Sequence, residues 1–156
     1  MTTIAFDGKV LASDSQMTLG DYRLDMNTQK IFMAKPSDNW RLDGNQIVAY
    51  GVAGKLVGVQ AVHEALTSYN GLTSNHRFPK GITLKYIAIT DKGVVYTGGQ
   101  YEDDELPWMA VVQPPVAIGS GCEFAIGAMA AGASSADAVR IAAKFDINTG
   151  GPVQEI

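Results

Sequence analysis

The sequence has few of the residues on which several classes of protein depend. It contains one cysteine and two histidines in 156 residues. An internal disulfide needs two cysteines, so none can form within the chain, which fits a reducing compartment such as the cytoplasm. The two histidines, His63 and His76, have no partner at the spacing of a zinc site. We therefore expect no metal site and no cofactor.

Long apolar runs and excess positive charge are also missing. No run approaches the roughly 18 apolar residues of a membrane span, and the first twenty residues lack the basic and apolar regions of a signal peptide. The formal net charge is −4, with 12 basic and 16 acidic residues. This composition lacks the basic footprint of a nucleic-acid-binding protein. We expect a soluble cytoplasmic protein that binds neither membranes nor nucleic acid.

What is present predicts one globular domain over residues 1–156, because a chain of this length buries about 70% of its unfolded surface. Amphipathic spacing predicts a helix over residues 55–69, and two helices are expected within residues 122–145. Residues 17–27 are polar and contain glycine, which predicts a loop. The other apolar runs predict hairpins and strands at residues 2–14, 29–34, 43–54, 84–99 and 108–121 and at the end of the chain. Strands and helices in separate runs favour an α+β fold.

The first hairpin is predicted from Asp7-Gly8, which lies between two β-rich runs and is typical of a two-residue type I′ turn. The facing positions then sum to 15, so that Thr2 faces Ser13. Asp14 lies one residue beyond that partner. Strict alternation would direct the Asp14 side chain to the opposite face from Thr2, so contact requires the strand to bend or end there.

Thr2, Asp14 and Lys30 are the groups that a self-activated N-terminal nucleophile needs. A free α-amine has a reference pKa of about 7.7 to 8 and can take the proton of the threonine hydroxyl. A buried lysine lowers the pKa of that amine by repulsion, and an aspartate holds the lysine charged and in place. The alternative is that Thr2 is an ordinary strand residue, Asp14 a turn residue and Lys30 a solvated charge.

Five motifs in order carry a resemblance to a known family. They are TTIAFDGKVLASDSQMT, QKIF, YGVAG, AIGSG and FDINTGG, and together they span nearly the whole chain. They resemble the proteasome β-subunit and HslV peptidase family of N-terminal nucleophile hydrolases. The resemblance implies a four-layer αββα sandwich, in which two antiparallel sheets lie between helix layers. It also implies assembly into rings whose active sites face an enclosed chamber.

The resemblance assigns roles to individual positions. Thr2 matches the nucleophile, whose α-amine serves as the base. Gly54 matches the glycine that donates a backbone N–H to the oxyanion hole. The remaining catalytic positions are Asp14, Lys30, Ser120, Asp146 and Thr149. The family's primary specificity pocket matches positions whose size and apolarity suggest a preference for an apolar residue before the cleaved bond. These positions are Met17, Thr18, Thr28, Val52 and Gly54.

The function implied by the resemblance is a threonine endopeptidase of a self-compartmentalising ring. Its substrate would be unfolded polypeptide, and a separate AAA+ ATPase unfoldase is a candidate partner. Only Met1 precedes Thr2, which is similar to HslV, where an aminopeptidase exposes the threonine. Two alternatives stay open: another N-terminal nucleophile amidohydrolase that acts on small amides, and a non-catalytic ring or scaffold subunit that retains Met1.

Overall fold

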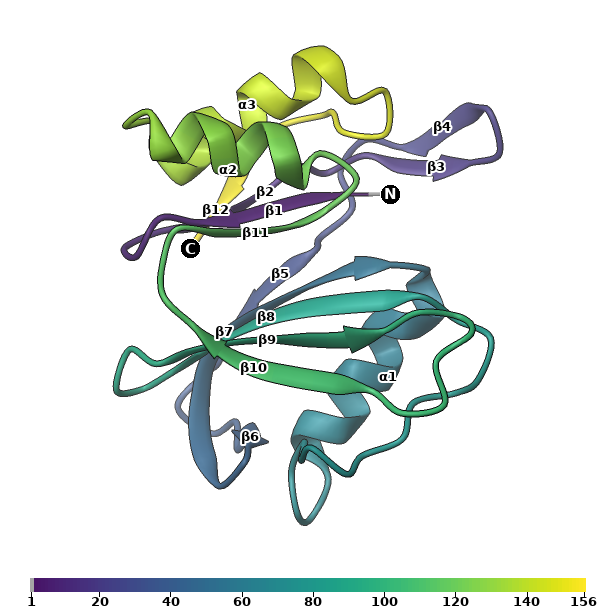
Figure 1. Cartoon of the computed structure of the whole chain (residues 1–156), viewed down its shortest axis with the longest axis vertical. Coiled ribbons are helices and arrows are strands. Elements are labelled where there is room, and N and C mark those ends of the chain that lie inside the picture. Colours follow the sequence, from purple (N-terminus) through teal and green to yellow (C-terminus); the bar gives the residue numbers. More distant parts are fainter. Residues whose placement is uncertain (1) are drawn as a thin grey trace. The chain divides into compact units, whose positions relative to one another are not determined.

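The computed structural model describes residues 2–156 (Figure 1). The expectation that Met1 is removed concerns a residue outside this range. The chain forms two compact units. The terminal unit holds residues 2–31 and 113–156, and the central unit holds residues 32–112. Sheets and three helices make up the fold of residues 2–156, which confirms the predicted α+β class.

The terminal unit is built on an antiparallel four-stranded sheet in the order β11-β1-β2-β12. Helices α2 and α3 pack against each other and cover one face of this sheet (Figure 1). The core between them consists mainly of alanines, whose small side chains let the helices approach the strands closely. The elements are β1 (Thr3–Phe6), β2 (Leu11–Ser13), β11 (Val116–Gly119), β12 (Gln154–Glu155), α2 (Cys122–Ala130) and α3 (Ser135–Phe145).

The helices begin and end where the sequence indicated. The Ser134 side chain caps α3 by accepting a hydrogen bond from the Asp137 N–H. Gly132, with φ +105°, follows α2 and takes a backbone conformation that residues with a side chain rarely adopt. No helix in residues 2–156 combines the length and apolarity needed to cross a membrane.

The β1–β2 hairpin has a different register from the predicted one. Ile4 pairs with Ser13 and Phe6 with Leu11, so the facing positions sum to 17. The connection between the strands is four residues long. The Asp7 carboxylate stabilises it by accepting hydrogen bonds from the N–H groups of residues 9 and 10. It also accepts the N–H of residue 135 at the start of α3. The predicted two-residue turn at Asp7-Gly8 is therefore wrong. A shift of two leaves every side chain on its predicted face.

Residues 17–27 were predicted as a loop, and this is wrong. They contain the hairpin of β3 (Met17–Leu19) and β4 (Tyr22–Asp25), which forms its own two-stranded sheet. The turn uses Gly20, whose φ is +58°. Leu19, Tyr22 and Leu24 are more than half exposed. The hairpin lacks a buried face, so the hydrophobic alternation that marks most strands is weak here.

The central unit has a six-stranded sheet in the order β10-β9-β8-β7-β5, with β6 paired to β7. The pairs β6–β7, β7–β8, β8–β9 and β9–β10 are antiparallel. Helix α1 packs against β6, β7 and β8, over a core that includes Tyr50 and Tyr86. Asp43 and Gly44 both have positive φ and form the two-residue turn predicted between β6 and β7. The elements are β5 (Ile31–Met33), β6 (Arg41–Leu42), β7 (Asn45–Gly54), α1 (Leu56–Thr67), β8 (Leu84–Thr90), β9 (Val95–Gln100) and β10 (Trp108–Val112).

Residues 108–121 were predicted as one strand interrupted by two prolines. They form two strands in different sheets, since β10 pairs with β9 in the central unit and β11 pairs with β1 in the terminal unit. Pro114 and Pro115, joined by a cis peptide bond, lie between them. Proline has no N–H to give to a ladder, so a proline pair is a natural end point for pairing in either sheet.

Candidate active site

Asp14 is the centre of the candidate site. Strand β2 ends at Ser13, and the fully buried Asp14 side chain turns back to accept the Thr3 N–H on Oδ1 at 3.0 Å. The same oxygen accepts a hydrogen bond from Lys30 Nζ at 2.8 Å. Oδ2 accepts the N–H groups of Gln16 at 3.3 Å and Gly150 at 3.1 Å. Four donors therefore hold the carboxylate in one orientation beside the start of β1.

Lys30 is the buried cation of this site. Its side chain is 6% exposed, and Nζ donates to Asp14 Oδ1 and to the backbone oxygen of Gln16. Burial lowers the pKa of Lys30, and the negative charge and hydrogen bond of Asp14 oppose that shift without cancelling it. The ammonium group donates to a carboxylate and to a backbone carbonyl oxygen. The alternative that Lys30 is a solvated surface charge is excluded.

Thr2 lies against the end of β11 and is 4% exposed. Its neighbour Thr3 pairs with Gly119, and a Cβ added at Gly119 would lie 1.8 Å from the Thr2 carbonyl oxygen. The Ser120 hydroxyl makes a long contact of 3.5 Å to the same oxygen. The first glycine of the Gly-Ser-Gly motif is therefore required by the close approach of β11 to residue 2.

Asp146 anchors a second group of polar side chains in the terminal unit. Its Oδ2 accepts the hydroxyl of Ser120 at 2.6 Å and that of Thr149. Its Oδ1 accepts the Asn148 N–H at 3.1 Å. Burial raises the pKa of Asp146, but the hydrogen bonds from the two hydroxyls and the backbone outweigh it, and the net pKa lies below its usual value. Ser120, Asp146 and Thr149, three of the predicted catalytic positions, form one hydrogen-bonded cluster.

The lowered pKa of Asp146 predicts a dependence of stability on acid pH. Its folded pKa lies below the reference value of 3.8, so the ionised group stabilises the fold above about pH 4. That contribution is lost as the pH falls through the folded pKa. Asp146→Asn should therefore flatten the dependence of the melting temperature on pH below about pH 4. Thermal unfolding between about pH 2.5 and 6 measures this, and Asp103→Asn, in the exposed loop after β9, is the control that should keep the wild-type slope.

The predicted substrate-binding positions are divided between the units. Met17 and Thr18 lie on β3 and are partly buried, and Thr28 donates its hydroxyl to Asp25 at 2.7 Å. In the central unit, Val52 is 2% exposed and packs in the core. Gly54 ends β7 with φ +125°, and a Cβ there would lie 2.5 Å from the Thr83 carbonyl oxygen. The geometry at Gly54 requires a glycine, whatever its N–H binds.

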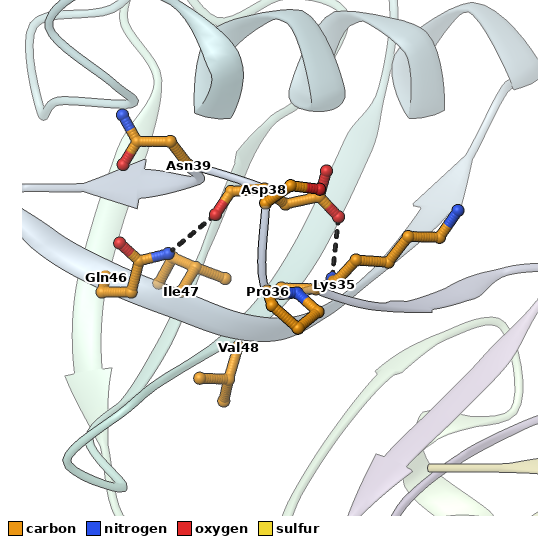
Figure 2. Close-up of a pocket in the computed structure, with 9 residues that line it drawn as sticks. Lys35, Pro36, Asp38, Asn39, Gln46, Ile47 and Val48 are labelled. Atoms are coloured by element: carbon orange, nitrogen blue, oxygen red, sulfur yellow. Dashed lines mark hydrogen bonds between the residues drawn. The ribbon is translucent and has the colours of Figure 1, made fainter.

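An open pocket lies in the central unit, between the loop after β5 and strand β7 (Figure 2). Its polar groups pair largely with one another: Asp38 accepts the Lys35 N–H at 2.8 Å, and its carbonyl oxygen accepts the Gln46 side-chain amide at 3.4 Å (Figure 2). None of the predicted catalytic or substrate-binding residues lines this pocket. It is a surface depression without a cluster of catalytic groups.

Sequence reasoning missed three contributors to the site. Thr3 gives its N–H to Asp14, and so do Gln16 and Gly150. The glycine pair Gly150-Gly151 was a signal in the sequence that the backbone passes close to another segment there. A Cβ at Gly150 would lie 2.4 Å from Gln16 Oε1, and a Cβ at Gly151 would lie 2.5 Å from Ser15 Oγ. Because neither glycine has a side chain, the segment that follows β2 can pack directly against their backbone.

Comparison with known proteins finds relatives by structure alone. No family model matches the chain, and no curated protein sequence matches it. Solved structures of Anbu proteins do resemble it. Anbu from Pseudomonas aeruginosa, described as a helical assembly, is 12% identical with a TM-score of 0.62, over 100% of this chain and 80% of that one. Anbu from Hyphomicrobium sp. strain MC1 is 15% identical with a TM-score of 0.59, over 99% and 80%.

A third structure, Anbu from Yersinia bercovieri, is described as an ancestral beta-subunit. It is 12% identical with a TM-score of 0.60 and covers 100% of this chain and 80% of that one. The prediction of the proteasome β-subunit and HslV peptidase family is wrong, because the solved structures that resemble the chain here are those of Anbu proteins. The glycines of two of the short motifs, at positions 119, 150 and 151, lie where a side chain would meet neighbouring atoms of the terminal unit. The chain has the fold of the Anbu proteins.

Proposed function

We propose that the chain is a threonine endopeptidase that hydrolyses peptide bonds of unfolded polypeptide, with Thr2 as nucleophile and the α-amine of Thr2 as base. The observation that carries the proposal is the buried Asp14–Lys30 pair, which is bonded at 2.8 Å and tied to the Thr3 N–H one residue from the nucleophile. A buried ion pair adds little to stability when compared with apolar packing, so a site that retains one calls for a chemical reason.

The residues of the terminal unit define the steps. The α-amine, once freed, takes the proton of the Thr2 hydroxyl as Oγ attacks the substrate carbonyl carbon. The protonated amine then gives that proton to the leaving nitrogen, and water hydrolyses the ester on Oγ by the same route. Positive charge on Lys30 lowers the pKa of the amine, so that more of it is neutral near pH 7. Asp14 holds the lysine, and Asp146 with its two hydroxyl donors orders the other side of the terminus.

The assigned oxyanion and substrate residues come from both units, because Val52 and Gly54 belong to the central unit and Met17, Thr18 and Thr28 to the terminal unit. We assign the Gly54 N–H to the oxyanion and Met17, Thr18, Thr28 and Val52 to the pocket for the residue before the cleaved bond. This assignment goes with the proposal of one domain over residues 1–156 and a four-layer αββα sandwich.

We also propose that the chain associates with copies of itself. The support is the likeness to Anbu from Pseudomonas aeruginosa, which is described as a helical assembly. A head-to-tail interface closes into a ring or continues as a helix according to its rotation angle. If the sites face an enclosed space, a separate ATP-driven unfoldase would deliver the substrate. Light scattering and electron microscopy of the purified chain measure the assembly.

The deciding experiment compares protein whose Thr2 amine is free with protein in which the preceding residue is retained, each verified by intact mass. Hydrolysis of a fluorescently labelled unfolded polypeptide should occur with the free amine alone, because an amide nitrogen cannot serve as the base. Equal turnover by both forms would contradict the mechanism. A monomer that cleaves only small amides would instead identify an amidohydrolase.

A further inference from the structure

Thr3 makes a side-chain contact that the mechanism above does not use. It is fully buried, although its side chain carries a hydroxyl. Its N–H donates to Asp14 Oδ1 at 3.0 Å, and its Oγ1 lies 2.6 Å from Thr149 Oγ1. Backbone and side chain of one residue therefore reach the two polar clusters of the terminal unit, one built on Asp14 and the other on Asp146.

The direction of the second hydrogen bond follows from the neighbours. The Thr149 hydroxyl has one hydrogen, which it donates to Asp146 Oδ2. Its oxygen must then accept, and Thr3 must donate. The hydroxyls form a chain that runs from Thr3 through Thr149 to the Asp146 carboxylate, and each bond strengthens the next.

The backbone around the two threonine hydroxyls leaves little free space beside them. A Cβ added at Gly121 would lie 2.2 Å from Thr3 Oγ1 and 3.1 Å from Thr149 Oγ1. The second glycine of the Gly-Ser-Gly motif thus allows the two hydroxyls to meet. The sequence around the site accommodates the Thr3 side chain specifically, as the first glycine of that motif accommodates the Thr2 carbonyl.

We propose that Thr3 is a positioning residue for the reaction at Thr2. Held by Asp14 at its N–H and by the Thr149–Asp146 pair at its hydroxyl, Thr3 fixes the start of β1 in two directions. The α-amine of Thr2 is separated from the Thr3 nitrogen by only two carbon atoms, so this fixation sets where the amine lies relative to Lys30. The inference rests on the proposed function of Thr2.

The test uses Thr3→Val, which keeps the shape of the side chain and removes the hydroxyl, in protein with a free Thr2 amine. We expect kcat to fall about 10- to 100-fold, as for a misplaced catalytic group, with little change in KM. The acid limb of the pH profile should move up towards the reference amine value of about 8, because the amine is less firmly held beside Lys30. Thr3→Ser keeps the hydroxyl and should restore both quantities.

A matched control removes another buried threonine hydroxyl. Thr97 on β9 donates to the Tyr86 carbonyl oxygen at 3.0 Å within the central unit. Thr97→Val loses one hydrogen bond of the same kind and should leave the pH profile unchanged, whatever it does to the melting temperature. A Thr3→Val protein with the wild-type kcat and pH profile would overturn the proposal.

A second measurement separates this proposal from the proposed function. The pKa of the Thr2 α-amine can be followed by NMR titration of protein labelled with ¹⁵N-threonine, without any turnover. An amine pKa that differs between wild type and Thr3→Val supports the positioning role, and an identical pKa refutes it. Wild-type protein with a free amine that hydrolyses no polypeptide would instead refute the peptidase proposal, while the titration still judges Thr3.

Discussion

Thr2→Ala is expected to abolish hydrolysis of unfolded polypeptide and to leave the fold and the self-association of the chain intact. Alanine keeps the α-amine but has no oxygen to attack a carbonyl carbon. Loss of the nucleophile in hydrolases that form an acyl intermediate lowers kcat by roughly 10⁶-fold, so residual turnover should be undetectable. Initial rates on a labelled unfolded substrate, with the N-terminus of each protein verified by mass, measure the effect.

Thr2→Ser is the matched control for that variant. It keeps a hydroxyl on the same carbon and should retain measurable turnover. The melting temperatures of both variants should stay close to that of the wild type. In the network around Asp14 and Asp146, residue 2 takes part through its backbone carbonyl oxygen and not through its hydroxyl, so neither substitution removes a hydrogen bond of that network. Hydrolysis by Thr2→Ala at a rate near that of the wild type would move the nucleophile to another residue.

Lys30→Met is expected to have the second largest effect, on the rate and on stability together. Methionine fills most of the same volume but carries no charge. The amine of Thr2 loses the charge that lowers its pKa, which alone costs about tenfold at pH 7 for an amine of pKa near 8. Together with a less well positioned proton acceptor, we expect kcat/KM near pH 7 to fall by about 10³-fold. Asp14 would be left buried without its ion-pair partner, at about 3 kcal/mol of unfolding free energy. The three backbone N–H groups that still bind Asp14 keep this value at the lower end of the expected range.

Two measurements separate the parts of that effect. Denaturant unfolding gives the loss of stability, and the pH profile of the remaining activity should have its acid limb shifted upwards towards the unperturbed amine. Lys144→Met, in the last turn of α3 and exposed, is a control that should change neither. A Lys30→Met protein with a normal rate at pH 7 would show that the buried lysine supports structure alone.

Two Asp-Gly pairs show when neighbouring residues are enough to predict a turn and when they are not. Asp43-Gly44 forms the two-residue turn that its sequence predicts, with φ values of +49° and +80°. Asp7-Gly8 carries the same signal and does not. The difference lies far along the chain: the Asp7 carboxylate also accepts the N–H of Ser135, at the start of α3 and 128 residues away. A turn prediction reads neighbouring residues, so it cannot include a partner that only tertiary packing supplies.

The sequence alone determined the α+β class, the three helices and the types of group at the candidate site. Hydrophobic spacing, helix caps and turn residues are signals that depend on neighbouring residues alone. The residue types at positions 2, 14 and 30 are read directly from the sequence. Tertiary structure decided that Asp14 also binds Gly150, 136 residues distant, and that the hydroxyl of Thr3 meets that of Thr149. A buried carboxylate accepts from whichever donors the fold brings within 3 Å or so, and that set follows from packing rather than from sequence spacing.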